Sequence, residues 1–183
     1  GLLLAGQALP VPFDAQVLKA ALDFVGGRLR GLLLERGYRY DIVDAVLKTQ
    51  AANPAKAERF ARSLGAWTAR EDWTSILPAY SRCARITRDL KEIFPVSESA
   101  LVESEERGLL ASVLAAQTKL ENSADLDAAL EAVRQMVPEI NAFFDKVLVM
   151  ADDENLRKSR LGLLQAIVAL VQPLADLSAL EGF

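Results

Sequence analysis

Four basic residues recur at every third position of one segment, namely Arg82, Arg85, Arg88 and Lys91. On an α-helix three residues turn the chain by about 300°, so the row spirals slowly and its first three members span about 120° of the surface. Basic side chains on an accessible helix face bind RNA phosphates, and arginine also stacks on unpaired bases. Arginines at this spacing more commonly lie on a helix face that only contacts solvent. RNA binding and a solvated surface are therefore both open interpretations of this row.

A shorter basic group comes earlier in the chain. Arg59 and Arg62 lie about one helical turn apart, and Lys56 precedes them by a similar step. These cations extend the same basic surface if the two helices pack as an antiparallel pair. Glu58 and the short length of the group favour an ordinary surface helix instead. Arg59 and Arg62 are therefore additional candidates for phosphate contact.

The residue types argue against catalysis and metal binding. The chain contains no histidine, which removes histidine acid–base chemistry, histidine metal ligands and nucleophiles activated by histidine. The adjacent acids of 152–154 cannot all face one ion, and their expected role is to stabilise a helix N-terminus. Gly26-Gly27 lacks the spacing and the preceding strand of a phosphate-binding loop. We expect no catalytic residue, no metal site and no cofactor bound by this chain itself.

The basic row needs a helix to carry it, expected from about Glu71 to Ile93 and ended by Pro95. One stripe of this helix faces the core, and it contains Ile76, Tyr80, Cys83, Thr87 and Leu90. The arginines lie largely away from that stripe. Cys83 is therefore expected to be a buried, unreactive filler, because the charges of its sequence neighbours point away from the thiol.

Aromatic residues of the same half are candidates for stacking on unpaired bases. Trp67 and Trp73 flank a polar turn, so one of the two is expected to be exposed. Tyr80 is expected in the core because it lies on the apolar stripe. Tyr38 and Tyr40 are expected to pack as well.

The fold class expected for the whole chain is all-α, a bundle of about seven to nine helices. Hydrophobic residues make up 51% of the chain and aromatic residues only 7%, a balance that favours helices over sheet. Residues 1–183 are expected to form a single helical domain, in which helices of about 1–50 lead into a bundle of 51–183. Expected helix starts are Asp14, Asp41, Asn53-Pro54, Asp125 or Asp127, Pro138, and Asp152 or Asp153. Expected stops are Gly37, Gly65 and the break at Asn122-Ser123, and Ser97–Glu106 is expected to be an acidic loop before a helix of Arg107–Leu120.

Charge is distributed unevenly along the chain. The net charge is −4, yet residues 1–93 hold 14 Lys and Arg against 10 Asp and Glu, whereas residues 94–183 hold 7 against 15. This asymmetry is compatible with RNA contact on one side.

The longest apolar run, Leu161–Leu174, falls short of the ~20 residues of a membrane span, so no membrane association is expected. The single cysteine fits a reducing compartment, and we expect the cytoplasm.

The segment Ala142–Leu164 has the sequence AFFDKVLVMADDENLRKSRLGLL. It resembles the signature of the DALR anticodon-binding domain of aminoacyl-tRNA synthetases, in which an aromatic-aliphatic run, a short acidic stretch and a basic-apolar helix start follow one another. The tetrapeptide Glu154-Asn155-Leu156-Arg157 departs at its first two positions, while the flanking positions fit. Asp145, Arg157 and Arg160 belong to this motif, and we interpret them as structural groups that hold the last helices together.

A second resemblance narrows the family. Arg28–Leu47, with the sequence RLRGLLLERGYRYDIVDAVL, is similar to the bacterial glycyl-tRNA synthetase beta subunit, as are Ala84–Leu90 and Ala175–Leu180. The resemblance implies a module that binds the tRNA anticodon region and is itself non-catalytic. It also implies partners, namely tRNA, a catalytic alpha subunit and the remaining beta-subunit domains, in an enzyme that uses ATP to attach glycine. Under this resemblance the candidate tRNA contacts are Arg82, Arg85, Arg88, Lys91, Arg59 and Arg62.

Two alternatives remain open from the sequence. The first is the same domain from another synthetase, the arginyl type, against which the match of Arg28–Leu47 argues. The second is a helical protein-interaction scaffold without RNA binding. Binding to total tRNA separates the scaffold from the synthetase domains, and purified isoacceptors separate the two synthetases.

Overall fold

The computed structural model describes residues 14–121, 123 and 125–183 of the chain. The expectations for residues 1–13 and for a break at Asn122 fall outside these residues. The described part contains seven α-helices, two short 3-10 helices and no strand, which confirms the all-α class. The elements are α2 (Ala15–Glu35), α3 (Tyr40–Gln50), α4 (Pro54–Thr68), α5 (Trp73–Thr87), η1 (Glu98–Ala100), α6 (Ser104–Leu120), α7 (Leu126–Lys146), α8 (Glu154–Val171) and η2 (Leu177–Ala179).

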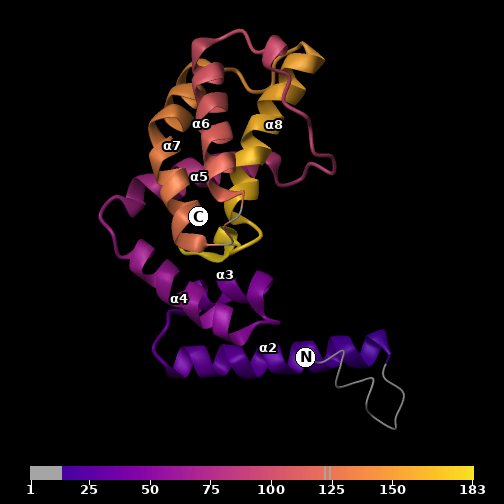
Figure 1. Cartoon of the computed structure of the whole chain (residues 1–183), viewed down its shortest axis with the longest axis vertical. Coiled ribbons are helices and arrows are strands. Elements are labelled where there is room, and N and C mark those ends of the chain that lie inside the picture. The colour runs from indigo at the N-terminus through magenta and orange to yellow at the C-terminus, as the bar shows by residue number, and fades with distance from the viewer. Residues whose placement is uncertain (1–13, 122, 124) are drawn as a thin grey trace.

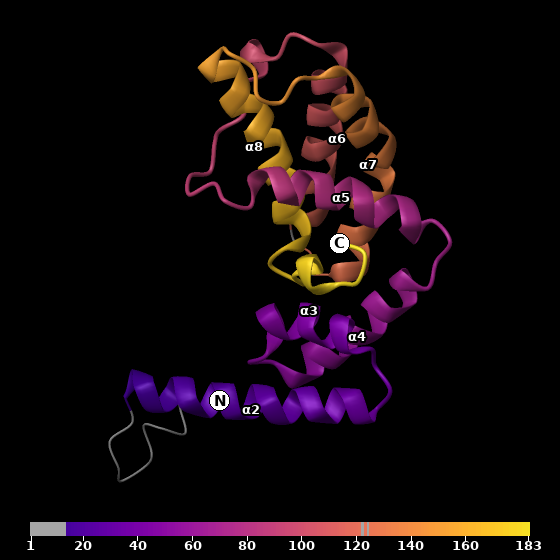
Figure 2. The ribbon, with the colours of Figure 1, turned by 180° about the vertical axis from the view of Figure 1, so that it is seen from behind.

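The helices form an upright bundle that stands on a smaller layer. Helices α6, α7 and α8 run alongside one another (Figure 1), and α5 crosses them on the face seen in Figure 2. Helices α2, α3 and α4 form the layer below, in which α3 packs on both of its neighbours and α4 reaches α7. The candidate arginines of α5 therefore lie on the bundle. The boundary expected near residue 51 stays a prediction.

Most helix starts follow from local side-chain chemistry. The Asp14 carboxylate accepts hydrogen bonds of 2.9 Å from the backbone amides of Gln16 and Val17, which caps α2. Gly37 ends the turn after α2 with a φ of 87°, a left-handed conformation that glycine adopts without a steric cost. The predicted caps at Asn53, Asp125 and Asp153 are likewise confirmed.

Two helices run further than predicted because packing outweighs a local breaker. Pro138 does not begin a new helix but lies inside α7, whose buried stripe continues from Leu126 to Phe143. Tertiary contacts with α5 and α6 hold this helix together despite the missing proline amide. Helix α4 likewise passes Gly65 and ends at Thr68.

Helices α3 and α6 begin earlier than predicted, and a buried carboxylate explains each start. Helix α3 begins at Tyr40, so Asp41 lies in its first turn instead of capping it. The Asp41 side chain is 1% exposed and accepts hydrogen bonds from the amides of Ile42 and Glu181 at 2.9 and 3.0 Å. Helix α6 begins at Ser104, within the expected loop, because Glu103 and Glu106 form a capping box.

The last residues of the chain fasten the lower layer to the bundle. We call residues 173–181 the C-terminal clasp. Asp176 pairs with Lys48 at 2.8 Å and its amide donates to the Ala45 carbonyl at the same distance. The Thr49 hydroxyl donates to the Leu174 carbonyl at 2.8 Å. Tyr40, which was expected to pack, is instead 54% exposed and donates its hydroxyl to the Glu181 carboxylate.

The core of the bundle encloses the only cysteine of the chain, as predicted. Cys83 is completely buried, and this burial raises the pKa of its thiol to about 12. A thiol reagent attacks through the thiolate, which is scarce here at neutral pH. We therefore expect a disulfide-forming reagent to label the native protein at least about a hundredfold more slowly than the urea-unfolded chain. Labelling at equal rates would show that the α5 stripe is exposed.

Candidate RNA-binding surface

The predicted basic row begins on α5 but does not stay on it. Helix α5 ends at Thr87, six residues before the predicted end, so Arg88 is the C-cap and Lys91 lies in the segment beyond it. The chain leaves the helix here because α8 holds it. Gln165 of α8 accepts a 2.9 Å hydrogen bond from the Phe94 amide and donates one of 2.7 Å to the Glu92 carbonyl. The prediction that one helix carries all four cations was therefore wrong for Lys91.

Arg82 is held within the protein. Its guanidinium lies over the Phe144 ring, 4.2 Å from the ring centre, and one of its nitrogens is 3.5 Å from the Asn141 side-chain oxygen. Both partners belong to α7, so Arg82 links α5 to α7 through a cation–π contact. This arrangement favours a structural role for Arg82 within the candidate group.

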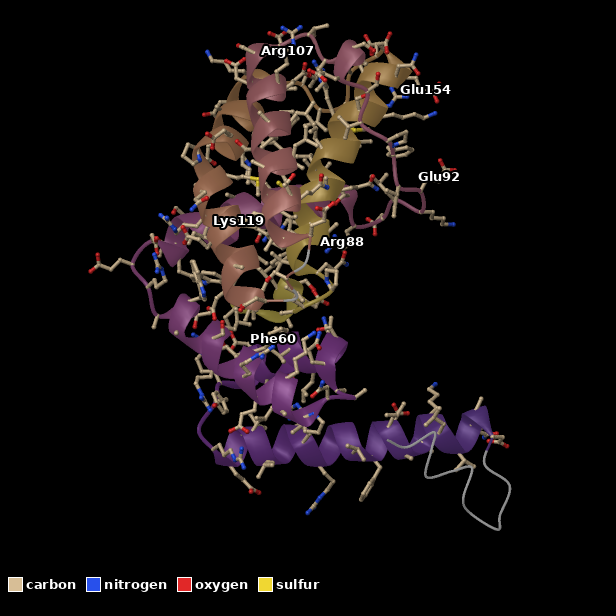
Figure 3. The ribbon with its side chains drawn as sticks, in the orientation of Figure 1. Phe60, Arg88, Glu92, Arg107, Lys119 and Glu154 are labelled. Atoms are coloured by element: carbon tan, nitrogen blue, oxygen red, sulfur yellow. The ribbon has the colours of Figure 1, made fainter. Side chains whose placement is uncertain are left out.

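Arg85 and Arg88 keep their guanidinium groups at the surface. The Arg85 side chain is exposed and lies over the Phe183 ring, 5.6 Å from the ring centre. The Arg88 side chain is 67% exposed and reaches Asp89 only at 4.0 Å, the limit of an ion pair. Figure 3 shows Arg88 beside α8 at the lower part of the bundle. These two arginines, together with the exposed Lys91, form the open basic group of the bundle, and we call them the basic edge.

The earlier basic group lies elsewhere. Helix α4 packs mainly on α3 and α7, while α5 packs on α7 and α8, so the two basic helices do not form the antiparallel pair on which the extension depended. Arg59 and Arg62 are exposed on the lower layer, where Figure 3 also labels Phe60. The Arg59 guanidinium is 5.3 Å from the Phe60 ring centre. The neighbouring Tyr38 raises the pKa of Arg62. The condition on which a common surface with the basic edge depended is therefore not met.

Neither tryptophan is available for stacking on a base. Trp67 is 7% and Trp73 is 8% exposed, so the expectation that one of them is exposed was wrong. The Trp67 ring nitrogen donates a 2.8 Å hydrogen bond to Asp127, and the Arg70 guanidinium covers the same ring at 4.6 Å. Both rings thus point into the protein, while residues 69–71 of the turn between them are exposed. Tyr80 is buried as predicted.

A cleft opens beside the basic edge, and the sequence did not reveal it. Its volume is about 730 Å³, and its walls come from the end of α5, the segment after it, α8 and the C-terminal residues. Arg88, Lys91, Phe94 and Phe183 all line it. Residues from such distant segments show no common spacing, which is why pattern analysis missed Phe94 and Phe183.

The motif arginines hold the upper end of the bundle, in agreement with a structural role. Arg160 is 5% exposed and pairs with Glu106, which is fully buried, and it also donates to the Leu148 carbonyl at 2.7 Å. Arg157 donates to the Ala151 carbonyl at 2.8 Å. Asp145 was expected to share in this network, but its side chain is exposed and Glu106 supplies the carboxylate instead.

Two further findings concern what the described residues lack. No cluster of three or more His, Cys, Asp or Glu side chains in the described ranges could hold a metal ion, and within 152–154 Asp153 instead caps α8 through a 2.8 Å hydrogen bond from the Leu156 amide. Among residues 14–121, 123 and 125–183 no helix is long and apolar enough to cross a membrane.

Comparison with known proteins gives one family model and several relatives. Residues 76–177 match the family described as the DALR anticodon binding domain. The chain is 36% identical to the glycine–tRNA ligase beta subunit of Moorella thermoacetica over 98% of its own length and 26% of that protein. It is 32% identical to the chloroplastic/mitochondrial glycine–tRNA ligase 2 of Arabidopsis thaliana, over 98% of this chain and 17% of that protein. The chain thus spans about a quarter or less of the length of these relatives.

Proposed function

The chain belongs to the DALR anticodon-binding domain family, and from this premise we propose that it binds the anticodon region of tRNA as one module of a glycine–tRNA ligase beta subunit. The observation that carries the proposal is the basic edge, which lies within the matched residues 76–177 and beside an open cleft. Anticodon loops present phosphates and unpaired bases together, and accessible arginines bind the first and stack on the second. The likeness to glycine–tRNA ligase beta subunits over 98% of the chain favours glycine over arginine as the amino acid.

The module contributes binding and orientation to the reaction of the whole enzyme. Contacts with the anticodon supply binding free energy and hold the tRNA so that its acceptor end reaches a distant active site. In this proposal a catalytic alpha subunit activates glycine with ATP in the cytoplasm, and the remaining beta-subunit domains connect that subunit to this module. The chain itself supplies no catalytic group.

Removing two cations of the basic edge tests the proposal. We expect Arg85→Ala with Arg88→Ala to weaken tRNA binding about tenfold at moderate salt, because two phosphate contacts are lost. The plot of log affinity against log salt concentration becomes shallower by about two units, one for each contact. Fluorescence anisotropy with labelled glycine tRNA over a salt series measures both quantities.

A matched double variant controls for the change in net charge. Arg30→Ala with Arg134→Ala also removes two arginines, but each of these pairs with a carboxylate away from the basic edge, at 2.7 and 2.6 Å. This variant should bind tRNA as the unchanged protein does. If both double variants lose the same tRNA affinity, the basic edge is an ordinary solvated surface. Equal affinity of the unchanged protein for arginine and glycine isoacceptors would remove the preference for glycine.

A further inference from the structure

The cleft beside the basic edge is wide enough for a ligand and has walls from four segments. Its volume of about 730 Å³ lies within the ~300–1,000 Å³ of small-molecule sites. Ala84 and Thr87 of α5 line it, as do Ala166 and Ala169 of α8, and Phe94 lies on the segment that follows α5. In Figure 3, Arg88 lies beside α8 while Glu92 lies further out along the same segment. The cleft therefore opens next to the residues that are proposed to bind phosphate.

The wall segment is held in place by α8, so the cleft is formed before any ligand arrives. Both polar groups of the Gln165 side chain bind backbone atoms of this segment, at Glu92 and Phe94. The segment also lies close against Gly162, where a side chain would collide with the Phe94 carbonyl. A ligand thus meets fixed walls and loses little binding energy to ordering them.

The chemistry of the walls matches an unpaired nucleobase. A base has two flat apolar faces and a polar edge, and proteins hold it by aromatic or guanidinium stacking with hydrogen bonds to that edge. Phe94 and Phe183 are half-buried in the cleft, so each keeps part of its ring accessible. Gln117 and Gln172 are exposed at the same cleft and offer amide groups for the edge.

Two exposed cations at the rim suit a ligand that carries phosphate better than an apolar peptide. Arg88 and Lys91 are opposed by Glu92 and Asp176, but Asp176 already pairs with Lys48 at 2.8 Å. Asp89 reaches Arg88 only at 4.0 Å, so the charges nearly balance while both cations stay exposed. An apolar helix would not need these cations, whereas a nucleotide places its phosphate beside its base. The cleft offers both contacts at adjacent positions.

We propose that this cleft takes one flipped-out base of the tRNA anticodon loop, with Arg88 and Lys91 on the adjoining phosphates. This assignment rests on the proposed tRNA binding and adds the position at which a base is held. It distinguishes two kinds of contact on one surface, namely cations that bind phosphates and a cleft that binds a base. Loss of the cations weakens binding to all RNA, whereas blocking the cleft weakens only RNA with an accessible loop base.

Filling the cleft tests the assignment. Ala169 is exposed and lines the cleft from α8, so Ala169→Trp occupies the space without entering the core. The probe is the anticodon stem-loop of glycine tRNA, with 2-aminopurine replacing one loop base at a time. With the unchanged protein, we expect one loop position to change its fluorescence on binding, because that base leaves its neighbours and stacks on protein. In Ala169→Trp this change is lost and affinity falls about tenfold.

Three controls accompany this experiment, namely a second tryptophan variant, a loop-free RNA duplex and a measurement of folding. Ala111→Trp places the same side chain at an exposed position of α6 outside the cleft and should bind as the unchanged protein does. Unchanged affinity and fluorescence in Ala169→Trp would overturn the cleft assignment while tRNA binding stands. If the unchanged protein binds no stem-loop, or binds a loop-free RNA duplex equally well, the proposed function itself fails. Circular dichroism of both variants reports whether they fold.

Cross-linking keeps the assignment falsifiable if Ala169→Trp fails to fold. A stem-loop with 4-thiouridine at the responsive position is irradiated with the unchanged protein, and the attached peptide is identified by mass spectrometry. We expect attachment within 90–96 or 165–172, two segments that line the cleft. Attachment confined to other segments would overturn the assignment.

Discussion

Replacing Arg160 by methionine is expected to lower the free energy of unfolding by about 3–5 kcal/mol. The substitution leaves Glu106 fully buried and without its cation, since the two form an ion pair whose side chains are 6% and 0% exposed. Glu106 also accepts hydrogen bonds of 2.7 and 2.8 Å from the amides of Val102 and Glu103 at the start of α6. The pair thus joins α8 to the first turn of α6. Urea unfolding followed by circular dichroism measures the change.

A second variant distinguishes the unpaired charge from lost packing. Adding Glu106→Gln to Arg160→Met removes the buried charge, so the double variant should be more stable than Arg160→Met alone. Lys158→Met breaks the exposed pair with Glu154 on the same helix and should leave the unfolding midpoint unchanged. If Arg160→Met unfolds at the same urea concentration as the unchanged protein, the pair does not carry the stability assigned to it.

Replacing Gly162 by alanine is expected to destabilise the protein by about 1–3 kcal/mol. Alanine normally strengthens a helix relative to glycine, but here its Cβ would lie 2.5 Å from the Phe94 carbonyl oxygen and 3.2 Å from a Val96 methyl. The nearest atom belongs to the backbone, so the segment that forms one wall of the cleft must move. We therefore expect weaker stem-loop binding to accompany the lower unfolding midpoint.

Gly108 provides the matched control for this substitution. It also lies inside a helix, α6, but no atom from outside its own stretch of helix lies within 4 Å of the position that a Cβ would take. Gly108→Ala should therefore stabilise the protein by about 0.5–1 kcal/mol, the ordinary difference between the two residues. The two glycine substitutions are expected to change stability in opposite directions, and the same direction for both would contradict the close approach at Gly162.

Features that depend on neighbouring residues could be predicted from the sequence. The caps at Asp14, Asn53 and Asp153 each use a side chain within three positions of its amide partner, so the local pattern was sufficient. The buried stripe of α5 and the position of Cys83 followed from helical spacing. The resemblance carried by Ala142–Leu164 is confirmed by the family match over residues 76–177.

Features set by distant residues could not be predicted in this way. Helix α5 stops at Thr87 because Gln165, more than seventy positions later, binds the segment beyond it. The partner of Arg160 is Glu106, 54 positions earlier, which the acidic composition of its segment had suggested was in a loop. Phe94 and Phe183 reach one cleft from separate segments. The part of the candidate site that could be foreseen was therefore the set of exposed cations Arg85, Arg88 and Lys91, but neither the place of Lys91 beyond the helix nor the cleft.

The C-terminal clasp also determines the order in which the chain assembles during synthesis. The Thr49 hydroxyl meets Leu174 across 125 positions, and Asp41 meets the Glu181 amide across 140. Such distant contacts close late, because the intervening chain must be ordered before they form. Helix α3 is synthesised before the clasp, so its packing is completed only after residue 181 has emerged. Until then the face of α3 that meets the clasp stays open to solvent and to other chains.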